Sequence, residues 1–266
     1  MNDYLNIKRL GKCLAYDIRS AKNNYGISLI VIGLLPVYLF LFDLLFNNVL
    51  GEESMPAHIF ALVCASIIAV ISFPVKTYGL LTEKKAGSQF LMLPASSLEK
   101  WISMLVVTCI VLPVCLFILV FGSDAILSLL WPKLYGDSLL KFISNGINSL
   151  YEVTEGTLNI HFLPLSFLTW SCDILIFTLG ALIFKKGKAS KTILACMCLG
   201  TIISFLSFKI LGSWHFSYSD NFILSFGDLE LDGFIRRFNT LINISFMLIL
   251  VPLLAGTYAR IKTLKH

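Results

Sequence analysis

Four histidines and seven cysteines are the residues best suited to nucleophilic or metal chemistry, and their spacing assembles no site. No histidine pair has the H-E-x-x-H spacing that places two zinc ligands on one helical face. The chain also lacks a G-x-S-x-G nucleophile elbow and a G-x-x-x-x-G-K-[ST] phosphate loop. Six cysteines fall inside apolar runs, where they behave as small hydrophobes, and no C-x-x-C occurs. We therefore expect no catalytic residue, metal site or cofactor, and any ATP hydrolysis would take place in another chain.

Asp173 is the side chain with the strongest functional signal, because it falls in the middle of a long apolar run. An ionisable group at membrane depth is costly and usually faces a cavity or a partner. We expect its side chain to face the interior of a helical bundle. It would be either a functional group or a protonated carboxyl that bonds to a neighbouring helix. The sequence offers no intramembrane Lys or Arg as its partner, which favours the structural role.

The composition excludes most soluble classes of protein. Of the 266 residues, 57% are hydrophobic and only 14% are charged, whereas soluble domains carry about 25% charged residues. We predict an all-α, polytopic integral membrane protein that forms one transmembrane domain over residues 1–266. The net charge of +5 is spread along the chain and does not indicate a nucleic-acid partner.

Six apolar runs are long enough, or nearly so, to cross a membrane as helices, for which about 20 residues are needed. They are continuously apolar, whereas the strands of a membrane barrel would alternate. The predicted spans are residues 27–46, 57–74, 101–122, 162–184, 192–208 and 238–259. Pro36, Pro113 and Pro252 interrupt three of them and predict kinks.

The distribution of Lys and Arg predicts the orientation of these spans. Sixteen of the 21 Lys and Arg residues fall before the first span, in the second and fourth loops, and after the last span. Positive charge accumulates on the cytoplasmic side of membrane proteins. We therefore expect both termini in the cytoplasm and a location in the bacterial inner membrane.

Residues 1–26 show a helical repeat of apolar residues, with five cations on the remaining positions. The apolar positions are Leu5, Ile7, Leu10, Leu14, Ile18, Ala21 and Tyr25. A helix of this kind lies in the headgroup layer with its apolar face toward the acyl chains. It would either anchor the first span or transmit force to it.

The loop after the second predicted span combines helical segments with a break. Residues 78–86 can continue the span as a helix, and Gly87 tolerates the backbone conformations of a break. A short transverse helix, residues 88–93, should end before Pro94, because the residue before a proline disfavours helix.

The same loop predicts a helix start and a contact surface. Ser96 and Glu99 form an S-x-x-E capping box for the helix that becomes the third span. Four consecutive apolar residues precede it: Phe90, Leu91, Met92 and Leu93. We expect them to be exposed, and an exposed apolar cluster usually marks a partner surface. The alternative is that they dip back into the membrane interface.

The residues Glu83, Gly87, Ser88, Pro94 and Ser96, with apolar residues between Ser88 and Pro94, resemble the cytoplasmic loop of ABC-2 type transporter permeases. Two residues depart from that pattern. Leu93 stands where many members have a small or polar residue, and Met104 stands where many have a basic residue. The resemblance implies that this loop forms a coupling helix that docks on a separate ATPase subunit. The docking residues would be Glu83, Gly87, Ser88, Phe90, Leu91, Leu93, Pro94 and Ser96.

Two outer loops carry weaker patterns. Residues 139–150 fit an amphipathic helix that either covers the bundle or gates a substrate. Residues 213–237 are rich in aromatics. They fit either a re-entrant pair of short helices, as in ABC-2 permeases, or an aromatic belt at the interface.

Together these patterns favour the permease subunit of an ATP-binding-cassette exporter. Its expected partners are a separate ATPase subunit, a second permease chain that is identical or related, and the lipid membrane. The alternative from another class is a non-transporting assembly or immunity factor that holds a partner in its outer loops. An intramembrane enzyme is the least favoured class, because no nucleophile or metal set is present.

Overall fold

The computed structural model describes residues 6–45, 55–83, 87, 88, 90, 92–141, 143, 144, 162–212 and 231–263. In these residues the chain is helical and contains no β-strand, which confirms the all-α class. Within this described part of the chain, four stretches are long and apolar enough to cross a membrane: Ile7–Phe42, His58–Thr82, Ser97–Leu130 and Phe246–Thr263. The helices are α1 (Ile7–Gly33), α2 (Leu35–Leu45), α3 (Met55–Lys76), η1 (Gly79–Thr82), α5 (Ser97–Val106), η2 (Val107–Val111), α6 (Leu112–Leu130), α7 (Pro132–Tyr135), α9 (Phe162–Ile183), α10 (Lys188–Gly212) and α11 (Leu231–Thr263).

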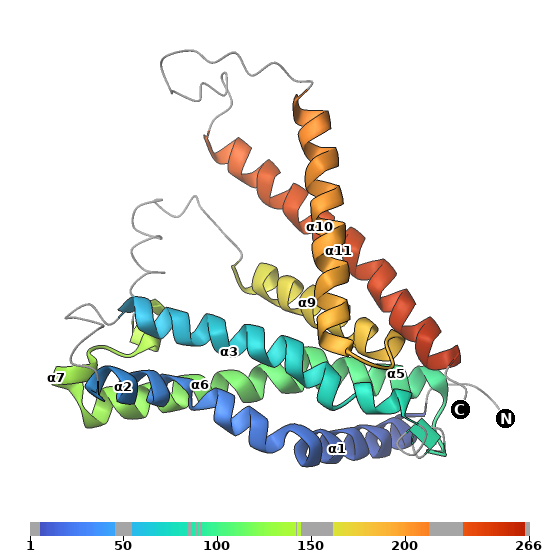
Figure 1. The fold of residues 1–266 in the computed structure, drawn as a ribbon, viewed down its shortest axis with the longest axis horizontal. Coiled ribbons are helices and arrows are strands. Elements are labelled where there is room, and N and C mark those ends of the chain that lie inside the picture. The colour runs from blue at the N-terminus through green and yellow to red at the C-terminus, as the bar shows by residue number, and fades with distance from the viewer. Residues whose placement is uncertain are drawn as a thin grey trace.

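The first helices form a bundle from which the last two diverge. The helices α1, α2, α3, α5 and α6 follow the long axis of the molecule, while α10 and α11 rise away from them beyond α9 (Figure 1). The start of α1, η1, the start of α5 and the end of α11 gather at one end (Figure 1). We call this the basic end, because Arg9, Lys100, Arg260 and Lys262 lie in these elements. The end that carries α7 is the opposite end.

The N-terminal helix has no boundary where the sequence suggested one. An interfacial helix to residue 26 and a separate span from residue 27 were expected, but α1 runs unbroken from Ile7 to Gly33. The break comes at Leu34, just before Pro36, because proline has no N–H to continue the helical ladder. The first half of α1 is therefore rigidly continuous with the first apolar run.

A π-turn interrupts the third apolar run. Within Val107–Val111 the backbone widens, and the N–H of Leu112 bonds to the carbonyl of Val107 instead of Thr108. In the widened register the Thr108 carbonyl would accept from residue 113, which is a proline without an N–H. The indole Nε1 of Trp170, on α9, donates to that open carbonyl at 3.4 Å. The irregular backbone is thus tied to α9.

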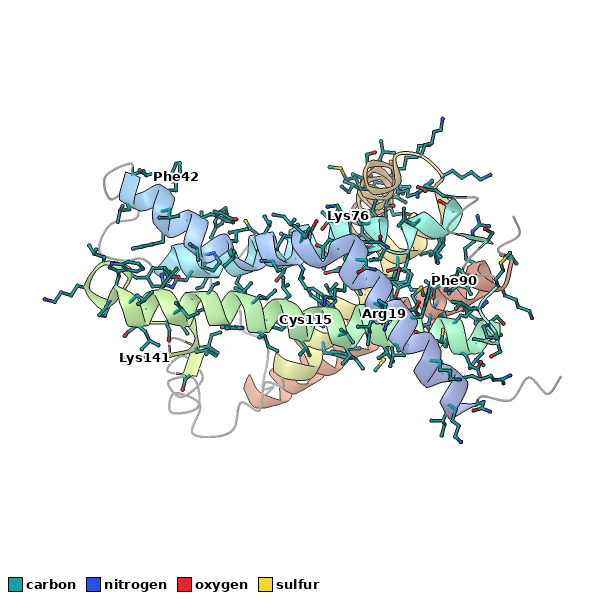
Figure 2. The ribbon with its side chains drawn as sticks, turned by 90° about the horizontal axis from the view of Figure 1, so that it is seen from below. Arg19, Phe42, Lys76, Phe90, Cys115 and Lys141 are labelled. Atoms are coloured by element: carbon teal, nitrogen blue, oxygen red, sulfur yellow. The ribbon has the colours of Figure 1, made fainter. Side chains whose placement is uncertain are left out.

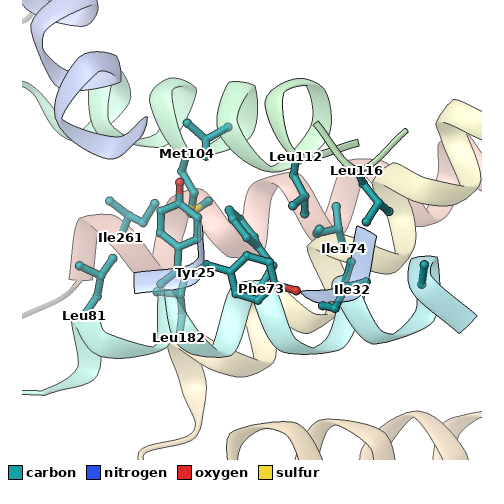
Figure 3. Close-up of a cluster of buried hydrophobic side chains, with 14 of the residues drawn as sticks. Tyr25, Ile32, Phe73, Leu81, Met104, Leu112, Leu116, Ile174, Leu182 and Ile261 are labelled. Carbon is teal, nitrogen blue, oxygen red and sulfur yellow. The ribbon is translucent and has the colours of Figure 1, made fainter. Parts of the chain in front are cut away.

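Close packing joins the helices in the middle of the bundle (Figure 3). Tyr25 of α1 meets Phe73 of α3 edge to face, with ring centroids 5.1 Å apart. Met104, Leu116 and Ile174 contribute fully buried side chains from three further helices. Lipid tails are as apolar as these side chains, so in a membrane the gain comes from tight van der Waals contact and not from escape from water.

Two glycines allow backbones to approach closely. A Cβ on Gly33 would lie 2.5 Å from the Cβ of Leu119, where α1 crosses α6. A Cβ on Gly180 would lie 2.0 Å from the Oγ1 of Thr192, where α9 meets α10. Gly256 of α11 is different, because a Cβ there would make an ordinary 3.4 Å contact with a leucine of α9. Small residues at the first two positions set the spacing of these helices.

Candidate functional site

The segment between α3 and α5 at the basic end is the part singled out by the sequence pattern. Residues 78–83 do not continue α3 as expected, because α3 ends at Lys76 and a tight 3-10 turn follows over Gly79–Thr82. The rest of the expected extension, residues 84–86, lies outside the described residues. The break also lies elsewhere than at Gly87. Glu83 is extended, with φ −89° and ψ 142°, whereas Gly87 is helical and its N–H bonds to the Glu83 carbonyl at 2.9 Å.

The apolar cluster of this segment is divided between interior and surface, so the expectation that Phe90 is exposed was wrong. Phe90 is only 5% exposed, and the Lys100 ammonium lies 5.1 Å from its ring centroid. Leu93 packs partly against the core, while Met92 is 81% exposed. Phe90 anchors the segment, and Met92 is the exposed apolar residue among those of the segment that the structure describes.

The remaining predicted docking residues differ in exposure. Glu83 and Pro94 are exposed, Ser88 and Ser96 are half-buried, and Gly87 is buried. Leu91 lies outside the described residues. Figure 2 shows Phe90 at the basic end, beside the oblique N-terminal half of α1.

The predicted capping box is confirmed, and its glutamate does more than cap. The Ser96 Oγ accepts from the Glu99 N–H at 3.2 Å, and the Glu99 Oε2 accepts from the Ser96 N–H at 2.9 Å. The other oxygen, Oε1, accepts from the Asn6 N–H at 2.8 Å and lies 3.3 Å from the Arg9 guanidinium. Glu99 is fully buried, so one carboxylate joins the start of α1 to the start of α5.

Two further contacts hold the segment to neighbouring helices. The Ser103 hydroxyl of α5 donates to Asp17, which is buried on the docked face of α1. The Lys188 ammonium, at the start of α10, donates to the carbonyl of Gly79. Burial lowers the pKa of Lys188, and the nearby Glu83 carboxylate partly opposes that shift. The turn between α3 and α5 is thus tied directly to α10, and α5, which follows it, is tied to α1.

A cleft of about 190 Å³ lies between α1 and this turn. Asp17, Ser20 and Asn24 line it from α1, and Tyr78 and Phe90 line it from the turn. Its walls therefore combine polar groups with apolar surface.

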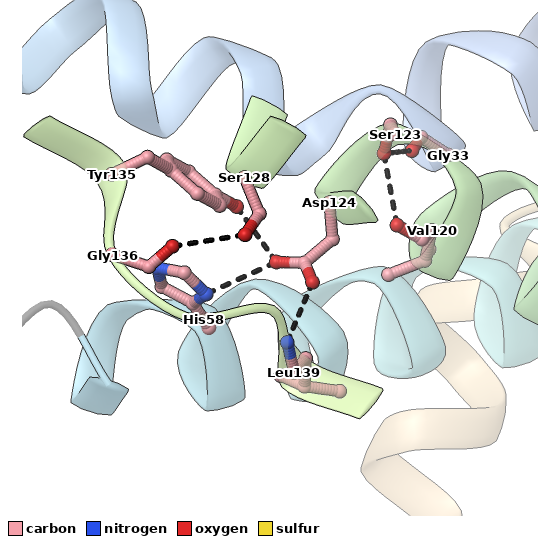
Figure 4. Close-up of polar contacts among 9 residues, drawn as sticks. All are labelled: Gly33, His58, Val120, Ser123, Asp124, Ser128, Tyr135, Gly136 and Leu139. Atoms are coloured by element: carbon pink, nitrogen blue, oxygen red, sulfur yellow. Dashed lines mark hydrogen bonds and ion pairs between the residues drawn. The ribbon is translucent and has the colours of Figure 1, made fainter. Parts of the chain in front are cut away.

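A second polar cluster closes the opposite end (Figure 4). The Asp124 carboxylate accepts from the Tyr135 hydroxyl at 2.7 Å and from the Leu139 N–H at 2.7 Å. The His58 Nδ1 lies 3.0 Å from the same carboxylate. Burial, together with the hydrogen bond to a carboxylate, raises the pKa of Tyr135. One carboxylate therefore joins α3, α6 and the chain that follows α7.

Sequence reasoning missed this cluster, although the signal was available. His58 lies at the start of the second predicted span and Asp124 just after the end of the third, which the predicted orientation places on the same, outer side. Residues 139–141, 143 and 144 are helical, which agrees with the start of the predicted outer helix. The predictions for residues 145–150 and 213–230 lie outside the described residues.

Asp173 does not face the bundle interior, so that expectation was wrong. Its neighbours Cys172, Ile174 and Leu175 are buried, because α9 packs between α3 on one side and α10 and α11 on the other. The Asp173 side chain points away from these contacts and is exposed. It therefore lies on the surface of a single chain.

Comparisons with protein-family models, with curated proteins and with solved structures found no match to this chain. The site is therefore interpreted from its own residues and geometry.

Proposed function

We propose that the chain is the permease subunit of an ATP-binding-cassette exporter, with six spans and both termini in the cytoplasm of an inner membrane. A separate ATPase subunit docks on the segment Gly87–Leu93, and two permease chains, identical or related, form the path. This extends the four membrane-crossing stretches by two spans in α9 and α10.

The observation that carries the proposal is an exposed apolar residue on a turn that is tied to several helices. Met92 is 81% exposed, and Phe90 holds the segment in the core. The Lys188–Gly79 contact and the buried Glu99 carboxylate join its surroundings to α10, α5 and α1. A push on Met92 would therefore be transmitted to helices that contact this turn, which is what coupling to ATP hydrolysis requires.

Site-specific photo-cross-linking in native membranes tests this proposal. A photoreactive residue replaces Met92, and a matched control replaces Leu134, which is 65% exposed at the opposite end. We expect position 92 alone to give an adduct whose peptides include a G-x-x-x-x-G-K-[ST] nucleotide-binding loop. Met92→Asp should weaken co-purification with that ATPase and leave membrane insertion intact, because insertion depends on the apolar helices.

A substitution of Phe90 serves as a control for loss of local structure, and it does not test docking. Phe90→Asp, unlike Met92→Asp, places a charge in the core and should destabilise the segment itself. Adducts from position 92 that contain only lipid, or normal ATP-driven transport with Met92→Asp, would reject the docking surface. The assembly or immunity factor would then become the better proposal.

A further inference from the structure

The exposed face of α1 carries a stripe of positive charge. Its four members are Lys8, Lys12, Arg19 and Lys22, and all are exposed. With 100° of turn per residue they fall within about 80° of one another, along about 21 Å of helix. Ala15 lies exposed in the middle of the stripe.

The opposite face of the same helix segment is the docked one. Cys13 and Asp17 are buried there. Asp17 is the one acidic residue in the described part of α1, and the fifth cation, Arg9, contacts Glu99. The stripe therefore presents positive charge without an acidic neighbour on its own face.

We propose that this stripe binds the headgroups of anionic phospholipids, independently of the proposed function. The N-terminal half of α1 runs obliquely across the basic end, with Arg19 on it (Figure 2). Ile7 and Ile18, which are 80% and 40% exposed, both lie along one flank of the stripe. Cations beside exposed apolar residues fit the boundary between headgroups and acyl chains better than they fit an acidic protein surface.

The expected strength follows from the number of charges. A basic residue near an anionic membrane surface contributes about 1 kcal/mol, which is about fivefold in affinity. Lys12→Gln with Arg19→Gln should therefore weaken binding of phosphatidylglycerol about 25-fold. The charge-retaining Lys12→Arg variant should bind as the unaltered chain does.

The test is native mass spectrometry of the purified full chain, titrated with phosphatidylglycerol or with phosphatidylcholine. Ala15→Glu and Ala15→Gln form the sharpest pair, because they differ only by a charge at an exposed position inside the stripe. We expect the affinity of the Ala15→Glu chain for phosphatidylglycerol to be about fivefold lower than that of the Ala15→Gln chain. The affinity for phosphatidylcholine should be the same in both. Equal thermal unfolding of the two variants in lipid-free detergent shows that the fold is intact.

Three results would overturn the proposal. The first is equal retention of the two lipids by the unaltered chain. The second is unchanged phosphatidylglycerol binding in the double glutamine variant. The third is loss of a protein partner by that variant while its lipid binding is intact, which would make the stripe a protein-docking face.

Discussion

Replacing Glu99 should detach the start of α1 from the start of α5. Glu99→Ala removes the two hydrogen bonds that the carboxylate accepts from the Ser96 and Asn6 N–H groups, at about 1.5–3 kcal/mol each for a charged acceptor. The Arg9 side chain is 32% exposed, so losing its ion pair adds at most about 1 kcal/mol. The total is about 3–7 kcal/mol. Glu99→Gln keeps one acceptor oxygen and should cost about half as much.

Cys13 reports this detachment, because it lies on the docked face of α1 and is only 3% exposed. In a chain that retains Cys13 alone, labelling by a thiol reagent requires local opening of the helix. A loss of about 3 kcal/mol in the opening free energy should accelerate labelling about 100-fold. Glu83→Gln is the matched control, because it removes an exposed carboxylate from the same turn. If Glu99→Ala labels no faster than Glu83→Gln, the carboxylate does not hold α1.

Further substitutions address the middle of the bundle. Gly180→Ala should destabilise the fold by about 1–3 kcal/mol through its clash with α10, while Gly256→Ala should be close to neutral, as measured by thermal unfolding in detergent. Trp170→Phe should destabilise it by about 0.6 kcal/mol, because the open carbonyl of the π-turn loses its donor. Combining Trp170→Phe with Pro113→Ala should recover that stability, because the alanine N–H can donate to the Thr108 carbonyl. If the effects of the two substitutions on stability simply add, this account is wrong. If two chains enclose an aqueous path, Asp173→Cys in an otherwise cysteine-free chain should react with a membrane-impermeant thiol reagent, and an unreactive thiol would place this face in lipid.

The sequence predicts the positions of the helices well, because each rests on a continuous apolar run and on local end signals. The capping box of Ser96 and Glu99 is such a signal, and it forms as expected. A local sequence pattern cannot show the hydrogen bond between Glu99 and Asn6, because Asn6 lies 93 residues away along the chain. The same limit explains the error at Phe90, since four apolar residues in a row look alike until the core selects which of them it buries.

The error at Asp173 has a different cause. The prediction assumed that a polar residue in an apolar run faces the interior of the bundle. In the structure α9 packs against neighbouring helices on two sides, and Asp173 lies on the part of its surface that no helix in the described part of the chain covers. A carboxyl on that surface is costly against lipid and inexpensive against water. Its exposure therefore agrees with the proposal that a second chain, facing this one across an aqueous path, completes the protein around α9.

The positions of the buried polar contacts indicate which part of the molecule can move. Carboxylates clamp both ends of the first helices, Glu99 at the basic end and Asp124 at the opposite end. Apolar contacts between the clamps gain little over contacts with lipid, so the clamps and the close contact of Gly33 with α6 fix the arrangement of α1 to α6. The diverging helix α10 is joined to the basic-end turn through Lys188 and Gly79. A displacement of that turn by an ATPase would therefore reach α10 directly, while the clamped helices resist it. This arrangement would move α10 relative to the first bundle, as a permease that opens and closes a path between two chains requires.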